Sequence, residues 1–482
     1  MSSTFGGLNT TRTALWASQR GLDVTGQNIA NVNTDGYSRQ RVELRAMGGT
    51  AVPAIHSVSS PVGNGVDADQ VNRIRDVFLE RRGQVESARA AQLTVGSEAL
   101  AQVESAFREP GETGIQSMLA DVWAGFSALA NAQDPTEPAV RSQVLERLDI
   151  LASGMRTTRA TLDQQWQLTR DNLQALAAEV NATASSIADL NAQIRQATRS
   201  GLPTNELSDR RDLLVMRLSE KVGATSSAAP DGMVDVVVGG TTLVASGSAL
   251  GLRVAGVDDP DQVGTGDDPR LVTVPGGTTL GVGGTAGGQI AVLSTTLPKY
   301  RDQLDQLARD LVGKLNGVQA QGFDTSGASG AAEPLMDDGS GRLPVDPATV
   351  NAGNISLRFT EPGKLAAAAR DPALLGQTSA DGRNAEAFFD LSLEAGGVDA
   401  RYRALVVGMG VEASVASRDL QVQKAISTQV DAARQSVSGV NLDEEMTNMM
   451  SFQHAYSAAA RMVTAIDEAL DTLISRTGLV GR

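Results

Sequence analysis

The stretch NLDEEMTNMMSFQHAYSAAARMVTAIDEALDTLI, residues 441–474, decides the fold of the C-terminal end. Its apolar side chains follow alternating steps of four and three residues, at Phe452, Tyr456, Ala459, Val463, Ile466, Leu470 and Leu473. Met449 and Leu442 extend the series backwards, with Glu445 as one polar exception. Such steps place side chains on one stripe of a helix, as in a coiled coil. The segment NLDEE supplies a capping Asn or Asp and an acidic first turn, so we predict a helix that begins there.

The N-terminal end carries a weaker stripe of the same kind. Leucine or isoleucine recurs every seven residues between residues 4 and 30, at Leu8, Leu15, Leu22 and Ile29. Arg12, Gln19 and Gly26 occupy the alternate positions, so this stripe is only half as apolar as a strong two-stranded coiled coil requires. The sequence therefore predicts a helix at each end of the chain, each with a coiled-coil stripe.

Polar turn residues follow the first helix in NIANVNTDGYSRQRVEL, residues 28–44. They are Asn28, Asn31, Asn33, Asp35, Gly36 and Tyr37. Asn, Asp and Gly tolerate a left-handed backbone and bond to their own turn, so a helix end followed by a braced turn and an extended segment is expected. An ordinary helix stop and a specialised assembly joint both fit this pattern. The physical argument alone favours the ordinary stop.

The middle of the chain is mainly helical. Helical periodicity is present at residues 66–107, 138–200, 206–222, 294–317 and 400–436. Residues 223–288 instead contain β-branched runs, and Gly239-Gly240 is typical of a two-residue hairpin turn. Residues 322–398 give weak signals, apart from a strand at NISLRF (354–359) and a short helix near 382–393.

These patterns predict a mainly α protein with three parts. Residues 1–60 with 437–482 form a terminal coiled-coil domain, residues 61–222 with 289–436 form a helical bundle, and residues 223–288 form an inserted β domain. Aromatic residues make up only 3% of the 482-residue chain, so the core must consist of Ala, Leu, Val and Ile.

Charge and composition exclude several classes of function. The 41 basic and 56 acidic residues give a net charge of −15, which would repel nucleic acid and anionic membranes. There is no cysteine, so thiolate catalysis and Cys-based metal sites are excluded. The N-terminus lacks the pattern of a cleaved signal peptide, and no run approaches the roughly 18 apolar residues of a membrane span. No membrane or nucleic-acid partner is therefore expected.

No motif supports an enzymatic reading. GVGGTA at residues 281–286 matches a dinucleotide fingerprint formally, but the acidic ribose contact about 20 residues further on is missing, so turn glycines are the preferred interpretation. The pairs Asp258-Asp259 and Asp267-Asp268 lack the spacing of a calcium loop and indicate solvated turns. His56 and His454 belong to no catalytic motif. We predict no catalytic residue, cofactor or metal.

Several segments carry a resemblance to a known family. ALWASQRGLDVTGQNIANVNTDGYSRQ resembles the N-terminal signature of bacterial flagellar rod, hook and hook-associated proteins, and GYSRQ is similar to the hook-associated members. VGNGVDADQVNRIRDVFLERR, NELSDRRDLLVMRLSEKVG, LPKYRDQLDQLARDLVGKLNGVQAQGFD and residues 438–474 agree with this resemblance. The resemblance is weaker in the β segment and in residues 322–398. A hook or distal rod subunit with the same ends is the nearest alternative, although a helical middle argues against it.

The resemblance implies a structural subunit that forms the junction between hook and filament outside the cell. Its implied partners are copies of itself in a ring, the hook protein, the next hook-associated junction protein, and a cytoplasmic export chaperone on the C-terminal helix. The chain would be exported unfolded through the flagellar secretion channel. The residues expected at the assembly interface are the two stripes with Leu442 and Met449, and the turn residues Asn28, Asn31, Asn33, Gly36 and Tyr37.

The two end helices are expected to be marginal by themselves. Burial of four seam side chains recovers only part of the backbone entropy that is lost when such a helix forms. We therefore expect residues 1 to about 35 and about 440 to 482 to be disordered or fraying in the free chain. They are expected to order against each other, antiparallel, when neighbouring subunits cover them.

Overall fold

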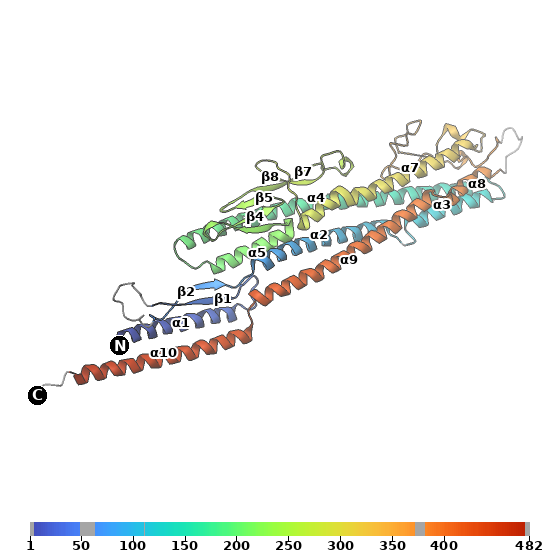
Figure 1. Cartoon of the computed structure of the whole chain (residues 1–482). Coiled ribbons are helices and arrows are strands. Elements are labelled where there is room, and N and C mark those ends of the chain that lie inside the picture. The colour runs from blue at the N-terminus through green and yellow to red at the C-terminus, as the bar shows by residue number, and fades with distance from the viewer. Residues whose placement is uncertain (1–3, 49–62, 110, 372–380, 478–482) are drawn as a thin grey trace. The chain divides into compact units, whose positions relative to one another are not determined.

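The computed structural model describes residues 4–48, 63–109, 111–371 and 381–477, and most of these residues are helical (Figure 1). Packing divides the chain into two compact units. The first unit contains residues 1–88, 180–251 and 424–482, and the second contains residues 89–179 and 252–423. Three of the division points fall within long helices, which are α2 (Val77–Phe107), α4 (Pro138–Arg199) and α9 (Val398–Ser438). The predicted mainly α fold class is confirmed.

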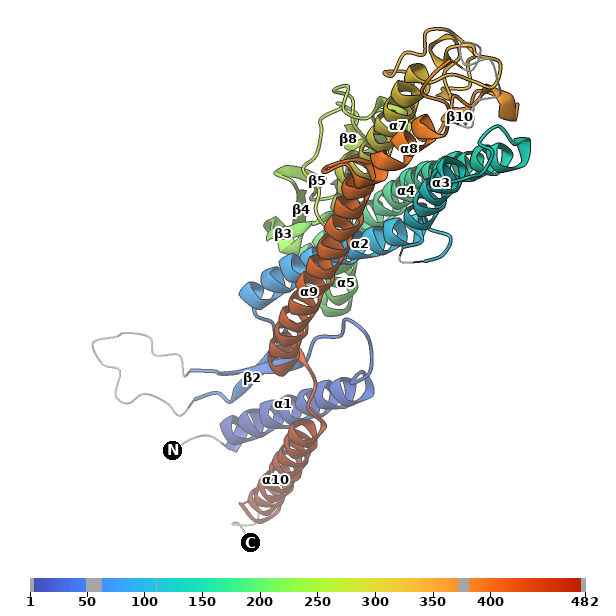
Figure 2. The same ribbon diagram turned by 90° about the vertical axis from the view of Figure 1, so that its right-hand side faces the viewer.

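The first unit brings both ends of the chain together. Its further elements are α1 (Thr4–Ala30), β1 (Gln40–Ala46), β2 (Val66–Arg73), α5 (Asn205–Val222), β3 (Thr225–Ala228), β4 (Val234–Val238), β5 (Thr241–Ala245), β6 (Ser248–Ala249) and α10 (Leu442–Thr477). Helices α1 and α10 lie side by side in both views (Figures 1 and 2), and they pack against each other over much of their length. The predicted helices at both ends are present.

Strands β1 and β2 cover a second face of α1. They pair antiparallel, with Gln40 opposite Arg73 and Val42 opposite Val71. The expected extended segment after the turn is thus confirmed, but the expected helix over 66–107 is wrong for residues 66–73. The physical reason is that β1 offers these residues a hydrogen-bonding partner beside α1, where the amide of Val66 donates to Thr13 Oγ1 at 3.3 Å.

A four-stranded antiparallel sheet in the order β3-β4-β5-β6 lies within the predicted β segment. Gly239 and Gly240 connect β4 to β5 with φ angles of 54° and 82°, so the predicted two-residue hairpin turn is confirmed. The end of α4 supports this sheet through Asn191, whose Nδ2 donates to the carbonyls of Val234 at 2.7 Å and Ser246 at 2.5 Å.

The second unit is a helical bundle with small β pieces. Its further elements are α3 (Ile115–Ala130), β7 (Gly251–Ala255), β8 (Arg270–Val274), α6 (Gly284–Ala291), a π-helical turn (Val292–Thr296), α7 (Leu297–Gln321), β9 (Met336–Asp337), β10 (Ser356–Leu357) and α8 (Arg383–Asp390). The helices predicted at 138–200, 206–222, 294–317, 400–436 and near 382–393 are present within a few residues, whereas α3 was not foreseen.

Few aromatic side chains organise this bundle. Trp166 is fully buried, and its indole N–H donates to the Leu293 carbonyl at 2.9 Å, which joins α4 to the π-helical turn. Phe126 of α3 stacks on Phe388 of α8 with ring centroids 4.4 Å apart. Elsewhere the core is built from Leu, Val and Ala side chains, as the composition indicated.

Candidate assembly interface

Helices α1 and α10 form an antiparallel pair with a constant register. Three close approaches define it, and they join Gly7 to Ile466, Gly21 to Phe452 and Asn28 to Glu445. From one contact to the next, the residue number rises by fourteen and then seven along α1 and falls by the same amounts along α10. A repeat of seven residues on both helices is the signature of coiled-coil packing, so the antiparallel pairing expected from the sequence is present within a single chain.

The seam of α1 consists of small side chains. It runs in steps of four and three through Gly7, Thr11, Ala14, Ser18, Gly21, Thr25 and Asn28, most of them buried. The hydroxyls of Thr11 and Ser18 donate at 2.8 Å to carbonyls one turn earlier in their own helix, which satisfies them without a partner on α10. Small residues let two helix backbones approach closely, so large side chains of α10 can fill the space between them.

Gly21 is the closest point of this approach. A Cβ atom built on Gly21 would lie 2.5 Å from Cε1 of Phe452, a distance that real Cβ contacts do not reach. Phe452 therefore occupies the place where a side chain would be, and Gly21 has a packing role despite its poor helix propensity.

The predicted leucine stripe lies beside this seam and not at its centre. Leu8, Leu15, Leu22 and Ile29 are half-buried. They follow the small seam residues by one position, which is a rotation of about 100° around the helix. Arg12 and Gln19, expected at the alternate seam positions, are exposed. The leucine positions therefore predict a contact face that is rotated by one residue from the observed one. The reason is that the residues facing α10 are small or polar and do not stand out as hydrophobic in the sequence.

On α10 the predicted stripe faces α1 in its central part. Ala459 is buried, and the following residues are half-buried: Met449, Phe452, Val463, Ile466 and Leu470. Leu442, Tyr456 and Leu473 are 45%, 42% and 48% exposed, so much of their apolar surface remains uncovered in the single chain. Glu445, the polar exception in the stripe, is only 2% exposed and lies within the seam.

Asn28 explains why a carboxylate can occupy that position. Its side chain is 1% exposed and makes four hydrogen bonds. Nδ2 donates to the Gln40 carbonyl at 2.9 Å and to Glu445 Oε2 at 3.0 Å, while Oδ1 accepts from the Tyr37 hydroxyl at 2.8 Å and from the Gln40 amide at 3.0 Å. Every donor and acceptor of the amide is satisfied.

Arg39 completes this group, which we term the Asn28 cluster (Asn28, Tyr37, Arg39, Gln40 and Glu445). Its Nε donates to Glu445 Oε1 at 2.7 Å, and its Nη1 donates to Glu444 Oε2 at 2.7 Å. Its backbone amide also donates to the Ser438 carbonyl at 2.8 Å, just before α10 begins. A buried carboxylate is tolerated when it is paired and hydrogen-bonded, so the cluster fixes the turn after α1 to the start of α10.

Tyr37 belongs to the cluster in its neutral form. Burial and the nearby carboxylates of Asp209, Glu445 and Glu206 raise the pKa of its phenol from 10.0 to about 12. The hydroxyl therefore keeps its proton and donates to Asn28 at all physiological pH values.

The remaining turn residues predicted from the sequence have local roles. Asn31 Nδ2 donates to the Gln27 carbonyl at 3.0 Å and its Oδ1 accepts from Thr34 at 3.1 Å, which closes the end of α1. Asn33 is exposed. Gly36 has a φ of 77°, a left-handed conformation that favours glycine. Of these turn residues, Asn28 bonds to Glu445 of α10, and Tyr37 bonds to Asn28.

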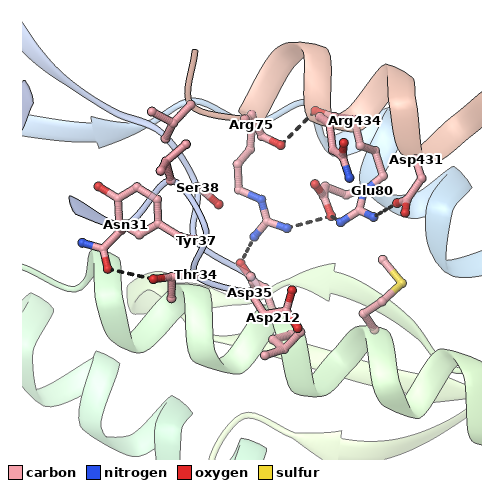
Figure 3. Close-up of a pocket in the computed structure, with 18 of the residues that line it drawn as sticks. Asn31, Thr34, Asp35, Tyr37, Ser38, Arg75, Glu80, Asp212, Asp431 and Arg434 are labelled. Atoms are coloured by element: carbon pink, nitrogen blue, oxygen red, sulfur yellow. Dashed lines mark hydrogen bonds and ion pairs between the residues drawn. The ribbon is translucent and has the colours of Figure 1, made fainter. Parts of the chain in front are cut away.

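A cleft of about 680 Å³ lies beside this turn, between the turn, α5 and the end of α9 (Figure 3). Arg75 lies between Asp212 and Glu80, and Glu80 also accepts from Arg434 Nη2 at 3.2 Å. Arg73 binds Asp209 and Asp212 at 2.9 and 2.8 Å. We term these residues (Arg73, Arg75, Glu80, Asp209, Asp212 and Arg434) the arginine network. It ties β2 and the segment after it to α2, α5 and α9. No local sequence pattern indicates this network, because its members lie far apart in the chain.

Asp212 is the central acceptor of the arginine network. Burial would raise the pKa of its carboxyl, but the guanidinium groups of Arg211, Arg75 and Arg73 outweigh burial and hold that pKa below its ordinary value. The ionised carboxylate is thus stabilised in the folded chain.

The residues considered for chemistry from the sequence have structural surroundings. The GVGGTA segment runs into the first turn of α6, where Ala286 is fully buried. Gly288, just after it, packs tightly, since a Cβ there would lie 2.8 Å from Val95 Cβ. Asp259 and Asp268 accept backbone amides of their own turns. His454 is exposed on α10, and His56 lies outside the described residues. Within the described ranges, no group of three or more His, Cys, Asp or Glu is arranged to hold a metal ion.

None of the helices in the described ranges carries an apolar run long enough to cross a bilayer.

Comparison with protein families assigns a class to this arrangement of paired ends. A flagella basal body rod protein model matches residues 8–37, which cover most of α1 and its turn, and a flagellar basal body rod FlgEFG protein C-terminal model matches residues 433–476, which include α10. The helical domain of flagellar hook-associated protein FlgK matches residues 100–332. The paired helices thus belong to a flagellar axial protein.

Curated relatives identify the family within this class. Flagellar hook-associated protein 1 of Bacillus subtilis is 30% identical over the full length of both chains. The Escherichia coli protein of that name is 24% identical over 97% of this chain and 99% of its own. The chain belongs to the flagellar hook-associated protein 1 family. A solved structure, the flagellar hook junction protein FlgK from Burkholderia pseudomallei, shares the fold with a TM-score of 0.61 at 17% identity, covering 74% of this chain and all of that one.

The close approach at Gly21 generates a first prediction. Gly21→Ala should weaken the α1–α10 pair by about 1 to 3 kcal/mol, because the new methyl group overlaps Phe452. Gly26→Ala is the matched control, since a Cβ there meets nothing within 4 Å and should stabilise α1 by up to about 1 kcal/mol. Hydrogen exchange of the α1 amides should be faster in the first variant and slower in the second. Similar exchange in both variants would contradict the seam.

The arginine network generates a prediction about acid. Because the pKa of Asp212 is lower in the folded chain, its carboxylate stabilises the fold above its unfolded pKa of about 3.9 and loses this effect as the pH falls through the folded pKa. Asp212→Asn should lower the free energy of unfolding at pH 7 by about 3 to 5 kcal/mol. It should also make the free energy of unfolding fall less between pH 7 and pH 3, because the substituted amide does not titrate.

Asp431→Asn is the control for that experiment. The Asp431 side chain pairs with Arg434 but is 57% exposed, so its loss should cost less than about 1 kcal/mol. Urea unfolding at pH 7 and pH 3 measures both variants. Equal effects of the two substitutions would show that the network is not a buried structural element.

Proposed function

We propose that the chain is a structural subunit of the bacterial flagellum that forms the junction between hook and filament and polymerises through its terminal helices. The observation that carries the proposal is the α1–α10 pair, with a register of seven residues and the Asn28 cluster at its end. These are the segments that match the rod-type family models. The helical-domain match over residues 100–332 favours this family over the hook or distal rod alternative.

The assembly interface that we propose consists of the residues predicted from the sequence. Seam residues left partly uncovered in the single chain, such as Tyr456 and Leu473, would be buried by neighbouring copies. On this account the α1–α10 pair is marginal in the free chain and gains its rigidity from burial during polymerisation, without a nucleotide or cofactor. The role is structural and not catalytic.

The partners we propose are copies of the chain in a ring, the hook protein and the next hook-associated junction protein, all outside the cell. We further propose export from the cytoplasm with a chaperone bound to α10. Met446, Met450 and Met462 on that helix are more than half exposed. Methionine-rich surfaces adapt to several partners in turn, which suits a helix that binds first a chaperone and then neighbouring subunits. The division into terminal, bundle and β domains also stays a proposal.

A deletion strain tests this function. Cells without the chain should keep hooks, lose motility and release filament subunits into the medium, and the wild-type chain should restore all three properties. Ile466→Asp should fail to restore motility, because it places a charge against Gly7 in the seam. Ser457→Asp, on the exposed side of α10, is the control and should restore motility. Normal filaments in the deletion strain, or full activity of Ile466→Asp, would overturn the proposal.

A further inference from the structure

The face of α1 opposite the seam carries an exposed tryptophan between two arginines. Trp16 lies nine residues after Gly7, half a turn away from the seam, and is 63% exposed. The Arg12 guanidinium lies over its ring at 5.2 Å and also donates to Asn9 Oδ1 at 2.9 Å. Arg20 is exposed one turn further on. Tryptophan and arginine are the residue types that dominate binding energy at protein interfaces.

These side chains line a groove of about 560 Å³ between α1 and β2, which we term the Trp16 groove. Arg12 and Arg20 make its α1 side basic, and neither arginine forms an ion pair within the described chain. Its β2 side carries Asp67 and Asp69. A ligand for the groove should therefore combine apolar surface for Trp16 with negative charge toward α1.

The end of α10 has this combination. Gly7 lies opposite Ile466, so Thr4, where α1 begins, is level with residue 469 of α10. The α10 residues after 469 therefore extend beyond Thr4. Leu473 and Ile474 there are 48% and 77% exposed. Three acidic residues, Asp467, Glu468 and Asp471, accompany them and form no ion pair within the described chain. We term residues 467–474 the α10 overhang; it is apolar on its seam side and carries these three acids beside it, and Arg476 follows it as a basic residue.

We propose that the α10 overhang of a second copy of the chain docks in the Trp16 groove. The inference rests on the proposed function and names the contact through which neighbouring copies meet. A chain cannot fill its own groove. Trp16 is level with residue 457 of α10, and Ile474 lies 17 residues further along that helix, a distance of roughly 25 Å. Both side chains also point away from the α1–α10 contact. A contact between two different surfaces repeats from copy to copy, and it produces a ring or helix rather than a closed dimer.

The other exposed part of α10 fits the groove less well. Met446 and Met450 are exposed near its start, but Glu444 beside them is already bound to Arg39. The start of α10 is therefore the alternative occupant of the Trp16 groove, and a cross-link from Trp16→Cys to Met446→Cys rather than to Ile474→Cys would identify it.

Charge exchange on the full chain in the deletion strain tests the contact, with the amount of chain on purified hooks as the readout. Arg12→Glu with Arg20→Glu should reduce that amount at least about tenfold, and so should Asp467→Arg with Asp471→Arg. All four substitutions together should restore it. Arg41→Glu with Arg45→Glu, on exposed positions of β1, is the control for the same change in net charge. Normal recruitment of either double variant, or no recovery in the fourfold variant, would overturn the proposal.

Cysteine cross-linking keeps the test independent of altered charge, because the chain has no cysteine. Trp16→Cys with Ile474→Cys should give a ladder of linked chains on mildly oxidised hooks, and either substitution alone should give none. A ladder with Trp16→Cys and Met446→Cys instead would replace the proposed occupant. If the wild-type chain is absent from hooks, the proposed function itself fails. If it is present but no ladder forms, only the docking proposal fails.

Discussion

The structure of the terminal unit depends on the close approach of two helix backbones. Along α1 the residues that face α10 are glycine, alanine, serine and threonine, and at Gly21 the ring of Phe452 occupies the space of a missing side chain. Close packing of this kind gains dispersion energy along the whole contact but tolerates no added volume. The large side chains are nearly all supplied by α10, so the seam is asymmetric: α1 provides the surface and α10 provides the side chains that fill it.

Small residues alone would allow the two helices to slide by one heptad. The Asn28 cluster removes this freedom, because a buried asparagine and a buried glutamate satisfy each other only in one register. Arg39 then connects the same glutamate to the turn, and its backbone amide reaches the residue that ends α9. The ends of the chain are thus held in register by polar contacts and held together by packing. Such a device suits a subunit whose ends must pair in a single register as neighbouring copies cover them.

The sequence predicted the helices far better than it predicted how they pack. The α10 stripe was readable because its large apolar residues show the heptad directly, and Gly239-Gly240 specified its turn through conformational preference alone. The α1 seam was not readable, because hydrophobicity does not detect a contact surface of Gly, Thr and Ser. Leu8, Leu15, Leu22 and Ile29 therefore predicted a contact face one residue after the observed seam. Glu445 was noted as an exception, and only the structure shows that Asn28 is its partner. The arginine network joins residues such as Arg75 and Asp212, more than one hundred positions apart, which no local pattern links.

The central claim, that α1 and α10 pair antiparallel in this register, is tested most directly by a disulfide across the seam. Ala14 and Ala459 fall at the same level between the Gly7 and Gly21 contacts, and the chain has no cysteine of its own. In chains assembled on hooks, Ala14→Cys with Ala459→Cys should form a disulfide within one chain under mild oxidation. Ala14→Cys with Ala458→Cys, turned by about 100° around α10, should not. Equal reaction of both pairs, or disulfides only between different chains, would contradict the account.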